Sequence, residues 1–189
     1  VAMGARQLRV GVPRYNGRVP YPKLRDQAVA QYHDVAALAR RYGVRALIEI
    51  HMGNITPSAS AAAAFVSHFD PRDVGIIHDA GNMVYEGYEQ YLMGLEMLGP
   101  YLAHVHLKSA VWRPAGERPD GSLAWEAVAA PIPRGQVDVA ALFRALRRVG
   151  YDEWVSFEDF STETPLLERV RQNLAYVKQV EQAVAAETA

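Results

Sequence analysis

The feature of this sequence that most restricts its fold is a regular alternation of short apolar runs with longer helical patterns. The expected strands cover Leu8–Val12, Ala46–Ile50, Val74–Ile77, Ala103–Leu107 and Trp154–Phe157. Between most of them, apolar residues recur every three to four positions, as they do in amphipathic helices. Strands that alternate with helices indicate parallel pairing, because each helix returns the chain to the same end of the sheet. The sequence therefore predicts an α/β fold.

Proline, glycine and capping residues indicate where the expected helices begin and end. Pro22 fits the first turn of a helix that Gly43 ends. The pair Thr56-Pro57 is expected to be the N-cap and first turn of an alanine-rich helix that reaches about Phe69. Helices of this kind can form the crossovers between parallel strands.

The segment 109–136 interrupts this pattern with four prolines and two tryptophans. We expect a short strand near Val128–Ile132 within it. Before this segment, the helix after the third strand is expected to carry Tyr88, Tyr91 and Leu98, with the tyrosines packed in the core.

Composition limits the possible functions. Of the 189 residues, 50% are hydrophobic and 22% are charged, and the net charge is −1. These values are typical of a globular protein, and the near-neutral charge argues against a nucleic-acid partner. The absence of cysteine excludes a disulfide framework and a thiol nucleophile. Since the sequence shows no membrane span and no secretory signal pattern, we expect a cytoplasmic protein without membrane contact.

Side chains that can bind metals recur at the carboxyl ends of the expected strands. Glu49 ends the second strand, Asp79 follows the third, His106 closes the fourth and Glu158 closes the last. The separations are 30, 27 and 52 residues, so the first two correspond to one strand–helix unit and the third to about two. In parallel α/β folds, the carboxyl ends of the strands meet on one face, where sites are built.

Three carboxylates and one imidazole at this face predict a site for one divalent ion, Mn²⁺, Mg²⁺, Co²⁺ or Zn²⁺. A single acidic residue after a strand is more often a helix cap or a solvated loop residue. Glu49 and Glu158, however, each end an apolar strand, where an unpaired carboxylate would be costly. A bound cation removes that cost, which favours the metal hypothesis for the four residues together.

Five short motifs in this order resemble a known family. They are Leu47-Ile48-Glu49-Ile50-His51, His78-Asp79-Ala80-Gly81-Asn82-Met83, His104-Val105-His106-Leu107-Lys108-Ser109, Arg134-Gly135-Gln136-Val137-Asp138 and Val155-Ser156-Phe157-Glu158-Asp159-Phe160. Together they resemble the xylose isomerase-like TIM barrels of the sugar phosphate isomerase/epimerase superfamily, over nearly the whole chain. The resemblance implies a (β/α)8 barrel that binds a single divalent metal ion.

The resemblance assigns the metal ligands to Glu49, Asp79, His106 and Glu158. It implies an isomerase or epimerase of carbohydrate metabolism that acts on a small sugar, a polyol-derived substrate or a related hydroxy-ketone. The metal would chelate two neighbouring oxygens of the substrate and stabilise an enediolate. Glu49 and Glu158 are then the catalytic pair, since one can take a proton from carbon and the other can return it.

Four further residues are expected to bind substrate, namely His51, Asn82, Lys108 and Arg113. Three of them have structural alternatives: His51 as a pore-lining polar residue, Lys108 as a solvated rim charge, and Arg113 as a loop arginine that binds no substrate group. The family motif has Asp after the lysine, whereas this chain has Ser109, which weakens any role for that position.

Two histidines and two tryptophans near these motifs have expected positions of their own. His104 shares a strand face with His106 and is expected to hydrogen-bond in the barrel interior, as a structural residue or as a support for the metal ligands. His78 is expected to face the helices in a structural role. Trp112 and Trp125 could form an apolar lid over a sugar ring or could pack the long segment onto the barrel.

Other functions remain open at this point. A metal-dependent dehydratase of the inosose or dehydroshikimate type also begins with proton abstraction beside a carbonyl, so the four residues do not distinguish it. An apurinic-site endonuclease is less favoured, because its trinuclear zinc cluster would require His where Asn82 stands. A non-catalytic remnant would bind a metal without turnover.

Length is the one property that conflicts with a complete barrel, which needs about 250 residues. Placing the four metal-binding residues on strands four, five, six and eight makes Leu8–Val12 strand three. We therefore expect residues 1–189 to form one incomplete xylose isomerase-like barrel domain with strands three to eight. Strands one and two would be absent because of N-terminal truncation, left unresolved, or replaced by contacts with a partner, and a homo-oligomer would cover the open strand edges.

Overall fold

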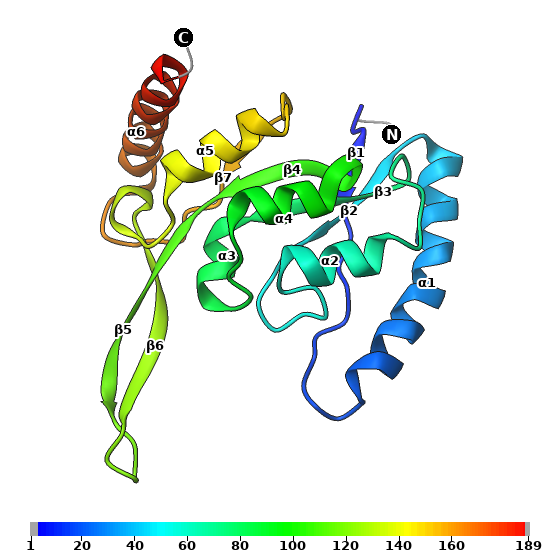
Figure 1. Ribbon diagram of the computed structural model, residues 1–189, viewed down its shortest axis with the longest axis horizontal. Helices are drawn as coiled ribbons and strands as arrows, with labels where there is room; N and C mark the ends of the chain where they lie inside the picture. Colours follow the sequence, from blue (N-terminus) through cyan, green and yellow to red (C-terminus); the bar gives the residue numbers. More distant parts are fainter. Residues whose placement is uncertain (1–3, 188–189) are drawn as a thin grey trace.

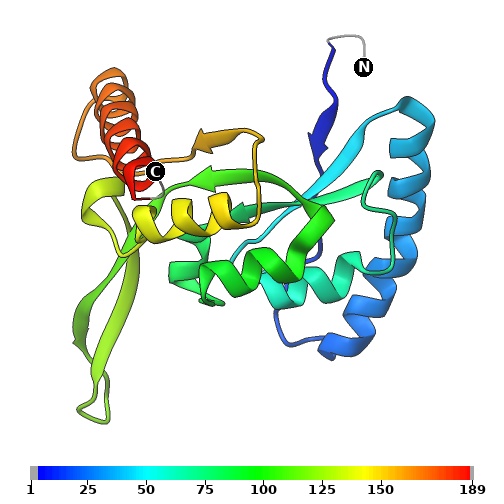
Figure 2. The same cartoon turned by 45° about the horizontal axis from the view of Figure 1, so that its top comes forward.

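A computed structural model describes residues 4–187 as a curled parallel sheet with helices packed along one face (Figures 1 and 2). The sheet order is β1 (Gln7–Arg9), β2 (Arg45–Glu49), β3 (Val74–Asp79), β4 (Leu102–Leu107) and β7 (Val155–Phe157), and every neighbouring pair is parallel. This confirms the α/β class and the incomplete barrel. The first strand ends at Arg9, three residues earlier than predicted.

The central strands owe their position to their apolar sequences. All six residues of β3 and four of the five residues of β2 are buried. Strands covered on both faces of a parallel sheet are apolar in this way. Many side chains of the strands belong to the two large apolar clusters beneath the helices. Leu47, Ile77 and Ala103 form a small separate cluster.

All described helices but the last lie in the connections between strands, and the last follows β7. The helices are α1 (Tyr21–Tyr42), α2 (Ala59–Val66), α3 (Ala80–Tyr85), α4 (Tyr91–Leu98), α5 (Val139–Arg148) and α6 (Leu166–Ala186), with short 3-10 turns at Gly99–Tyr101 and Ile132–Arg134. Pro22 lies in the first turn of α1, and Gly43 ends that helix with a φ of 63°, as predicted. None of the described helices has the length and apolar character needed to cross a membrane.

Three features of the helices differ from the sequence prediction. The N-cap of α2 is Ser58, whose hydroxyl accepts a hydrogen bond from the backbone N–H of Ala61 at 3.3 Å, so Thr56 does not cap this helix. The helix also ends before Phe69. Tyr88 lies in the loop between α3 and α4 and is 67% exposed, so the expected single helix is divided and this tyrosine is not part of the core.

The largest difference lies between β4 and β7. β5 (Ser109–Glu117) and β6 (Leu123–Ala130) pair antiparallel and form a hairpin that projects away from the sheet (Figure 1). The predicted strand at Val128–Ile132 is therefore not a strand of the parallel sheet. As a result, β7 lies directly beside β4, and the described residues form five parallel strands rather than the six expected for strands three to eight.

Candidate metal centre

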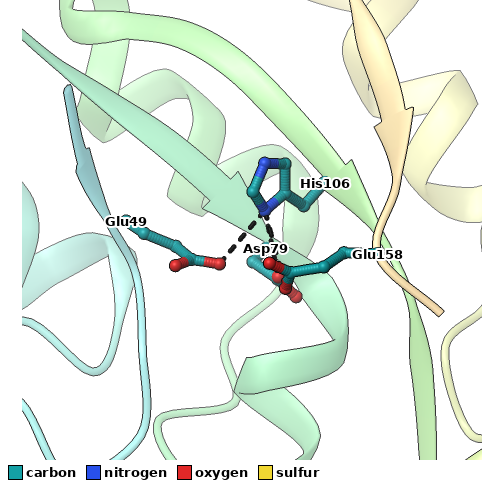
Figure 3. A group of neighbouring side chains, drawn as sticks. All are labelled: Glu49, Asp79, His106 and Glu158. Atoms are coloured by element: carbon teal, nitrogen blue, oxygen red, sulfur yellow. Dashed lines mark hydrogen bonds and ion pairs between the residues drawn. The ribbon is translucent and has the colours of Figure 1, made fainter. Parts of the chain in front are cut away.

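The four predicted metal ligands meet at the carboxyl ends of the strands (Figure 3). Glu49 and Asp79 end β2 and β3, His106 is the next-to-last residue of β4, and Glu158 directly follows β7. Because side chains alternate along a strand, Glu49 lies on the same face as Leu47, away from the large helix-covered clusters. One ligand atom from each of the four residues lies within 4.8 Å of the others.

We call these four side chains the metal cluster. His106 contacts all three of its carboxylates. Its Nδ1 lies 3.1 Å from Oε1 of Glu49, 3.6 Å from Oδ2 of Asp79 and 3.7 Å from Oε2 of Glu158. Burial lowers the pKa of His106, but hydrogen bonds to Asp79 and Glu49 and the charges of these carboxylates outweigh burial and raise it to about 9. Without a metal ion, the imidazole is therefore a positive partner for the carboxylates.

Arg9, the last residue of β1, pairs with the other oxygen of Glu49. Its guanidinium contacts Oε2, whereas Oε1 faces His106. Burial raises the pKa of Glu49, but the hydrogen bond from His106 and the charges of Arg9, His106 and Lys108 outweigh it and lower the pKa to about 2. Arg9 was not predicted as part of the site, because the expected strand Leu8–Val12 placed it near the start of that strand and not at its end.

Lys108 is buried in the metal cluster. The residue is 5% exposed, and its ammonium group lies 3.1 Å from Oδ2 of Asp79 and in direct contact with Oε2 of Glu158. Burial lowers the pKa of Lys108, but the two carboxylates outweigh that effect and raise it. The alternative of a solvated charge at the rim is therefore wrong.

Asp79 and Asn82 connect the cluster to helix α3. Oδ1 of Asp79 accepts a hydrogen bond from the backbone N–H of Asn82 at 2.8 Å and so caps the helix. The side-chain Nδ2 of Asn82 donates to Oε1 of Glu49 at 3.3 Å and to the carbonyl of Ile50 at 3.0 Å. Burial raises the pKa of Asp79. Asn82 is thus placed to orient Glu49, and it is itself fully buried.

The other two predicted substrate-binding residues make contacts elsewhere. Nδ1 of His51 lies 2.8 Å from the carbonyl oxygen of Met52. Arg113 lies on the hairpin, where its guanidinium pairs with Glu126 at 2.8 Å and where its charge is solvated. Within residues 4–187, no hydrogen bond or ion pair joins His51 or Arg113 to the four residues of the metal cluster.

His104 and His78, from the sequence motifs, lie as predicted. Nε2 of His104 lies 2.8 Å from the hydroxyl of Ser156, and its ring packs edge-on against His106. His78 is fully buried and meets the ring of Tyr91 in α4 edge-on, so it faces the helices. Burial lowers the pKa of His78 to about 4, and the side chain is neutral at physiological pH.

Trp112 and Trp125 lie on the hairpin. The indole N–H of Trp112 donates to the carbonyl of Val84 at 2.7 Å, which fastens the base of the hairpin to α3. Trp125 is 50% exposed on the opposite strand. This contact of Trp112 is the kind expected if the segment packs onto the barrel.

The donor set of the metal cluster suits a divalent cation. Three carboxylates and one imidazole nitrogen provide the oxygen-rich, mixed ligands that Mn²⁺, Mg²⁺, Co²⁺ and Zn²⁺ accept. Buried carboxylates at such close approach require positive charge beside them. In this structure Arg9, Lys108 and His106 provide it.

Comparison with known proteins identifies relatives of the chain. The model of the family described as xylose isomerase-like TIM barrel matches residues 1–180. Among curated proteins, an inosose dehydratase of Geobacillus thermodenitrificans is 27% identical over 126 residues, which are 64% of this chain and 42% of that protein. The chain thus spans less than half the length of this curated relative.

Solved structures share the fold at low sequence identity. An L-ribulose 3-epimerase has a TM-score of 0.77 at 18% identity, covering 98% of this chain and 64% of its own. A xylose isomerase-like protein of Mycobacterium smegmatis in complex with magnesium has a TM-score of 0.70 at 21% identity, with coverages of 97% and 63%. The IOLI protein with a zinc atom has a TM-score of 0.66 at 18% identity, again with 97% and 63%. The chain therefore spans less than two thirds of each.

Proposed function

The chain belongs to the xylose isomerase-like TIM barrel family, and on that premise we propose that it is a divalent-metal-dependent isomerase or epimerase of a sugar or related hydroxy-ketone. The observation that carries the proposal is the metal cluster, in which ligand atoms of Glu49, Asp79, His106 and Glu158 lie within 4.8 Å of one another. The fold shared with an L-ribulose 3-epimerase supports this substrate class.

Glu49, Asp79, His106 and Glu158 would hold the metal ion. When bound, a divalent ion polarises a substrate carbonyl and stabilises the negative charge left when a neighbouring carbon loses its proton. We propose Mn²⁺, Mg²⁺, Co²⁺ or Zn²⁺, and relatives that contain magnesium or zinc support this range.

Glu49 and Glu158 are the proposed acid–base pair. β2 and β7 lie on either side of β3 and β4, so the two glutamates reach the site from opposite sides (Figure 3). Arg9 and Asn82 hold Glu49 in place, and the hydrogen bond from His106 together with the charge of Arg9 keeps Glu49 ionised, as a base requires. The other glutamate returns the proton. Return to the opposite face gives epimerisation, and return to the adjacent carbon gives isomerisation.

Substrate oxygens are the proposed partners of His51, Asn82, Lys108 and Arg113. Asn82 and Lys108 are already in contact with the metal cluster, which supports their assignment most directly. The buried Oδ1 of Asn82 has no hydrogen-bond partner among the described residues and could accept from a substrate hydroxyl.

A dehydratase is the second candidate, because the curated relative with 27% identity is an inosose dehydratase. Both reactions begin with removal of a proton beside a carbonyl, so the same glutamates serve both. They differ in the second step, since a dehydratase expels a hydroxyl group from the adjacent carbon.

The discriminating experiment measures the mass of the product. The chain is stripped with EDTA, reloaded with each of the four ions in turn, and incubated with ketoses and an inosose. A changed configuration at unchanged mass supports the isomerase or epimerase, and loss of one water supports the dehydratase. Failure of the chain to bind any of these ions would refute both.

The substitution Glu158→Gln tests the role of the glutamate in that reaction. It is expected to lower turnover by at least about 100-fold, because the amide cannot carry the proton. The circular dichroism spectrum should not change. Glu168→Gln, in the first turn of α6, is the matched control and should retain full activity. Retained activity in the Glu158→Gln variant would reject this assignment.

A further inference from the structure

The ammonium group of Lys108 contacts carboxylate oxygens that would also bind a metal ion. Its ammonium group contacts Oδ2 of Asp79 and Oε2 of Glu158. These two oxygens also face Nδ1 of His106, at 3.6 Å and 3.7 Å. The lysine therefore engages two of the carboxylate oxygens of the metal cluster from inside the protein.

Neighbouring elements bury the side chain of Lys108. Its side chain is 6% exposed, and its ammonium lies 5.2 Å from the ring centre of Phe160. Gly81 in α3 provides the necessary space, because a Cβ at that position would overlap Cγ of Lys108 and lie 2.8 Å from its carbonyl carbon and oxygen. Helix α3 can approach the end of β4 this closely only with glycine there.

Arg9 shows that a cation beside the cluster need not compete with a metal. It contacts Oε2 of Glu49, while Oε1 of that residue is the oxygen that faces His106. Its side chain is 53% exposed, so its charge is screened by water. Arg9 and Lys108 therefore differ in both the oxygens they engage and their burial.

We propose that Lys108 is an internal cation that occupies the Asp79–Glu158 side of the metal site and thereby weakens its affinity for divalent ions. A lysine ammonium and a divalent ion at these oxygens repel each other strongly, because the site is buried. Loading of the metal therefore requires the ammonium to leave Oδ2 of Asp79 and Oε2 of Glu158. This inference rests on the proposed function, since it presumes that the cluster binds a metal.

Displacement gives the lysine a second role. The ring of Phe160 is exposed and lies 5.2 Å from the ammonium, so the flexible stem would let the displaced ammonium move along this ring toward the mouth of the site. There it can donate hydrogen bonds to a substrate oxygen. Metal loading would thus change Lys108 from a partner of the carboxylates into a substrate-binding group.

The test compares the Mn²⁺ affinity of the stripped full chain with that of the variant Lys108→Met. Methionine keeps most of the apolar stem and removes the charge. The variant is expected to bind Mn²⁺ at least about tenfold more tightly in calorimetric titration. Lys178→Met makes the same chemical change at an exposed position of α6 and should leave the affinity unchanged.

A second measurement separates this role from a merely structural one. In EDTA, Lys108→Met should unfold at a lower temperature than the natural chain, because two carboxylates lose their partner. Saturating Mn²⁺ should then raise its melting temperature by more than it raises that of the natural chain. A structural role would instead lower stability and metal affinity together.

The outcomes distinguish the two proposals. If the natural chain binds Mn²⁺ and Lys108→Met binds it equally or more weakly, the role of Lys108 is refuted and the proposed function stands. If neither protein binds Mn²⁺, the proposed function fails and this inference fails with it. Lys108→Arg, which keeps the charge, is expected to bind Mn²⁺ no more tightly than the natural chain. Tighter binding by this variant would also refute the role, even if Lys108→Met does not fold.

Discussion

Two carboxylates of the metal cluster divide their oxygens between different partners. In Asp79, Oδ1 caps α3 through the backbone of Asn82, and Oδ2 faces His106. In Glu49, Oε1 faces His106, and Oε2 pairs with Arg9. Each carboxylate is therefore oriented by a contact outside the cluster, which reduces the conformational freedom it loses when it binds a ligand.

Substitutions of Asp79 separate capping from metal binding. Asparagine can still accept the hydrogen bond from Asn82, so Asp79→Asn should retain the cap but bind Mn²⁺ at least about tenfold more weakly. Asp79→Ala loses the cap as well and should reduce the free energy of unfolding by about 1 kcal/mol more than Asp79→Asn. Urea unfolding in EDTA and calorimetric Mn²⁺ titration measure the two effects. Equal stability of the two variants would contradict the capping role.

Tyr32 makes folding sensitive to alkaline pH. The side chain is buried, its hydroxyl donates to the carbonyl of Val10 at 2.9 Å, and burial raises its pKa. Because its pKa is higher in the folded than in the unfolded chain, its contribution to stability is complete below about pH 10 and is lost as the pH rises further.

The substitution Tyr32→Phe tests this dependence. It should lower the free energy of unfolding at pH 7 by about 1 kcal/mol through the lost hydrogen bond. Above about pH 10, the variant should lose stability less steeply than the natural chain. Urea unfolding between pH 7 and 11 gives both values, and Tyr42→Phe, at an exposed position, is the control. Equal slopes above pH 10 for Tyr32→Phe and the natural chain would count against the assignment.

At the scale of single elements, local hydrogen bonds decide where α2 begins. Ser58 has extended backbone geometry, and its hydroxyl receives the N–H of Ala61. Thr56, two residues earlier, is fully buried, and its hydroxyl has no hydrogen-bond partner among the described residues. Either residue type can cap a helix, so only the backbone conformation distinguishes the two positions.

Paired substitutions test this boundary. Ser58→Ala should lower the free energy of unfolding by about 1 kcal/mol, because an N-cap is lost. Thr56→Val should leave stability unchanged or increase it, because its buried hydroxyl has no partner to lose. Thermal and urea unfolding compare the variants. A larger loss for Thr56→Val would place the cap where the sequence pattern predicted it.

At the scale of the whole molecule, the curled sheet ends in open edges. Within residues 4–187, β1 pairs only with β2, and Leu8 in this strand is 60% exposed. A groove of about 330 Å³ beside it is lined by apolar side chains of α1 and of the segment 8–10, including Val10, Leu38 and Tyr42. Unpaired strand edges with exposed apolar side chains favour association between chains.

The substitution Leu8→Lys is expected to reduce this association. A charge on an edge strand opposes pairing with another strand, and an exposed position tolerates it with a change in stability below about 0.5 kcal/mol. Size-exclusion chromatography with light scattering over rising protein concentration measures the apparent mass. A mass that rises equally in the natural chain and the variant would show that this edge is not involved.

Local patterns predict much of the fold and of the metal cluster. Glu49 and His106 lie on the inner face because side chains alternate along a strand, and Gly43 ends a helix because of its left-handed backbone. The arrangement around the hairpin was not predictable in the same way. The residues of β6 suit either a parallel strand or a hairpin, and the choice depends on a partner elsewhere in the chain.

The sequence by itself determined the alternation of strands and helices and the position of the four candidate metal ligands at the strand ends, because these features depend on neighbours a few residues away. Only the tertiary structure decided that β7 lies beside β4 and that Arg9 and Lys108 reach the carboxylates. For Arg9 and Lys108, the physical reason is the length of their side chains. A lysine or arginine has several rotatable bonds, so its position in the sequence locates its Cα, while the burial and charge contributed by distant elements decide where its charged end lies.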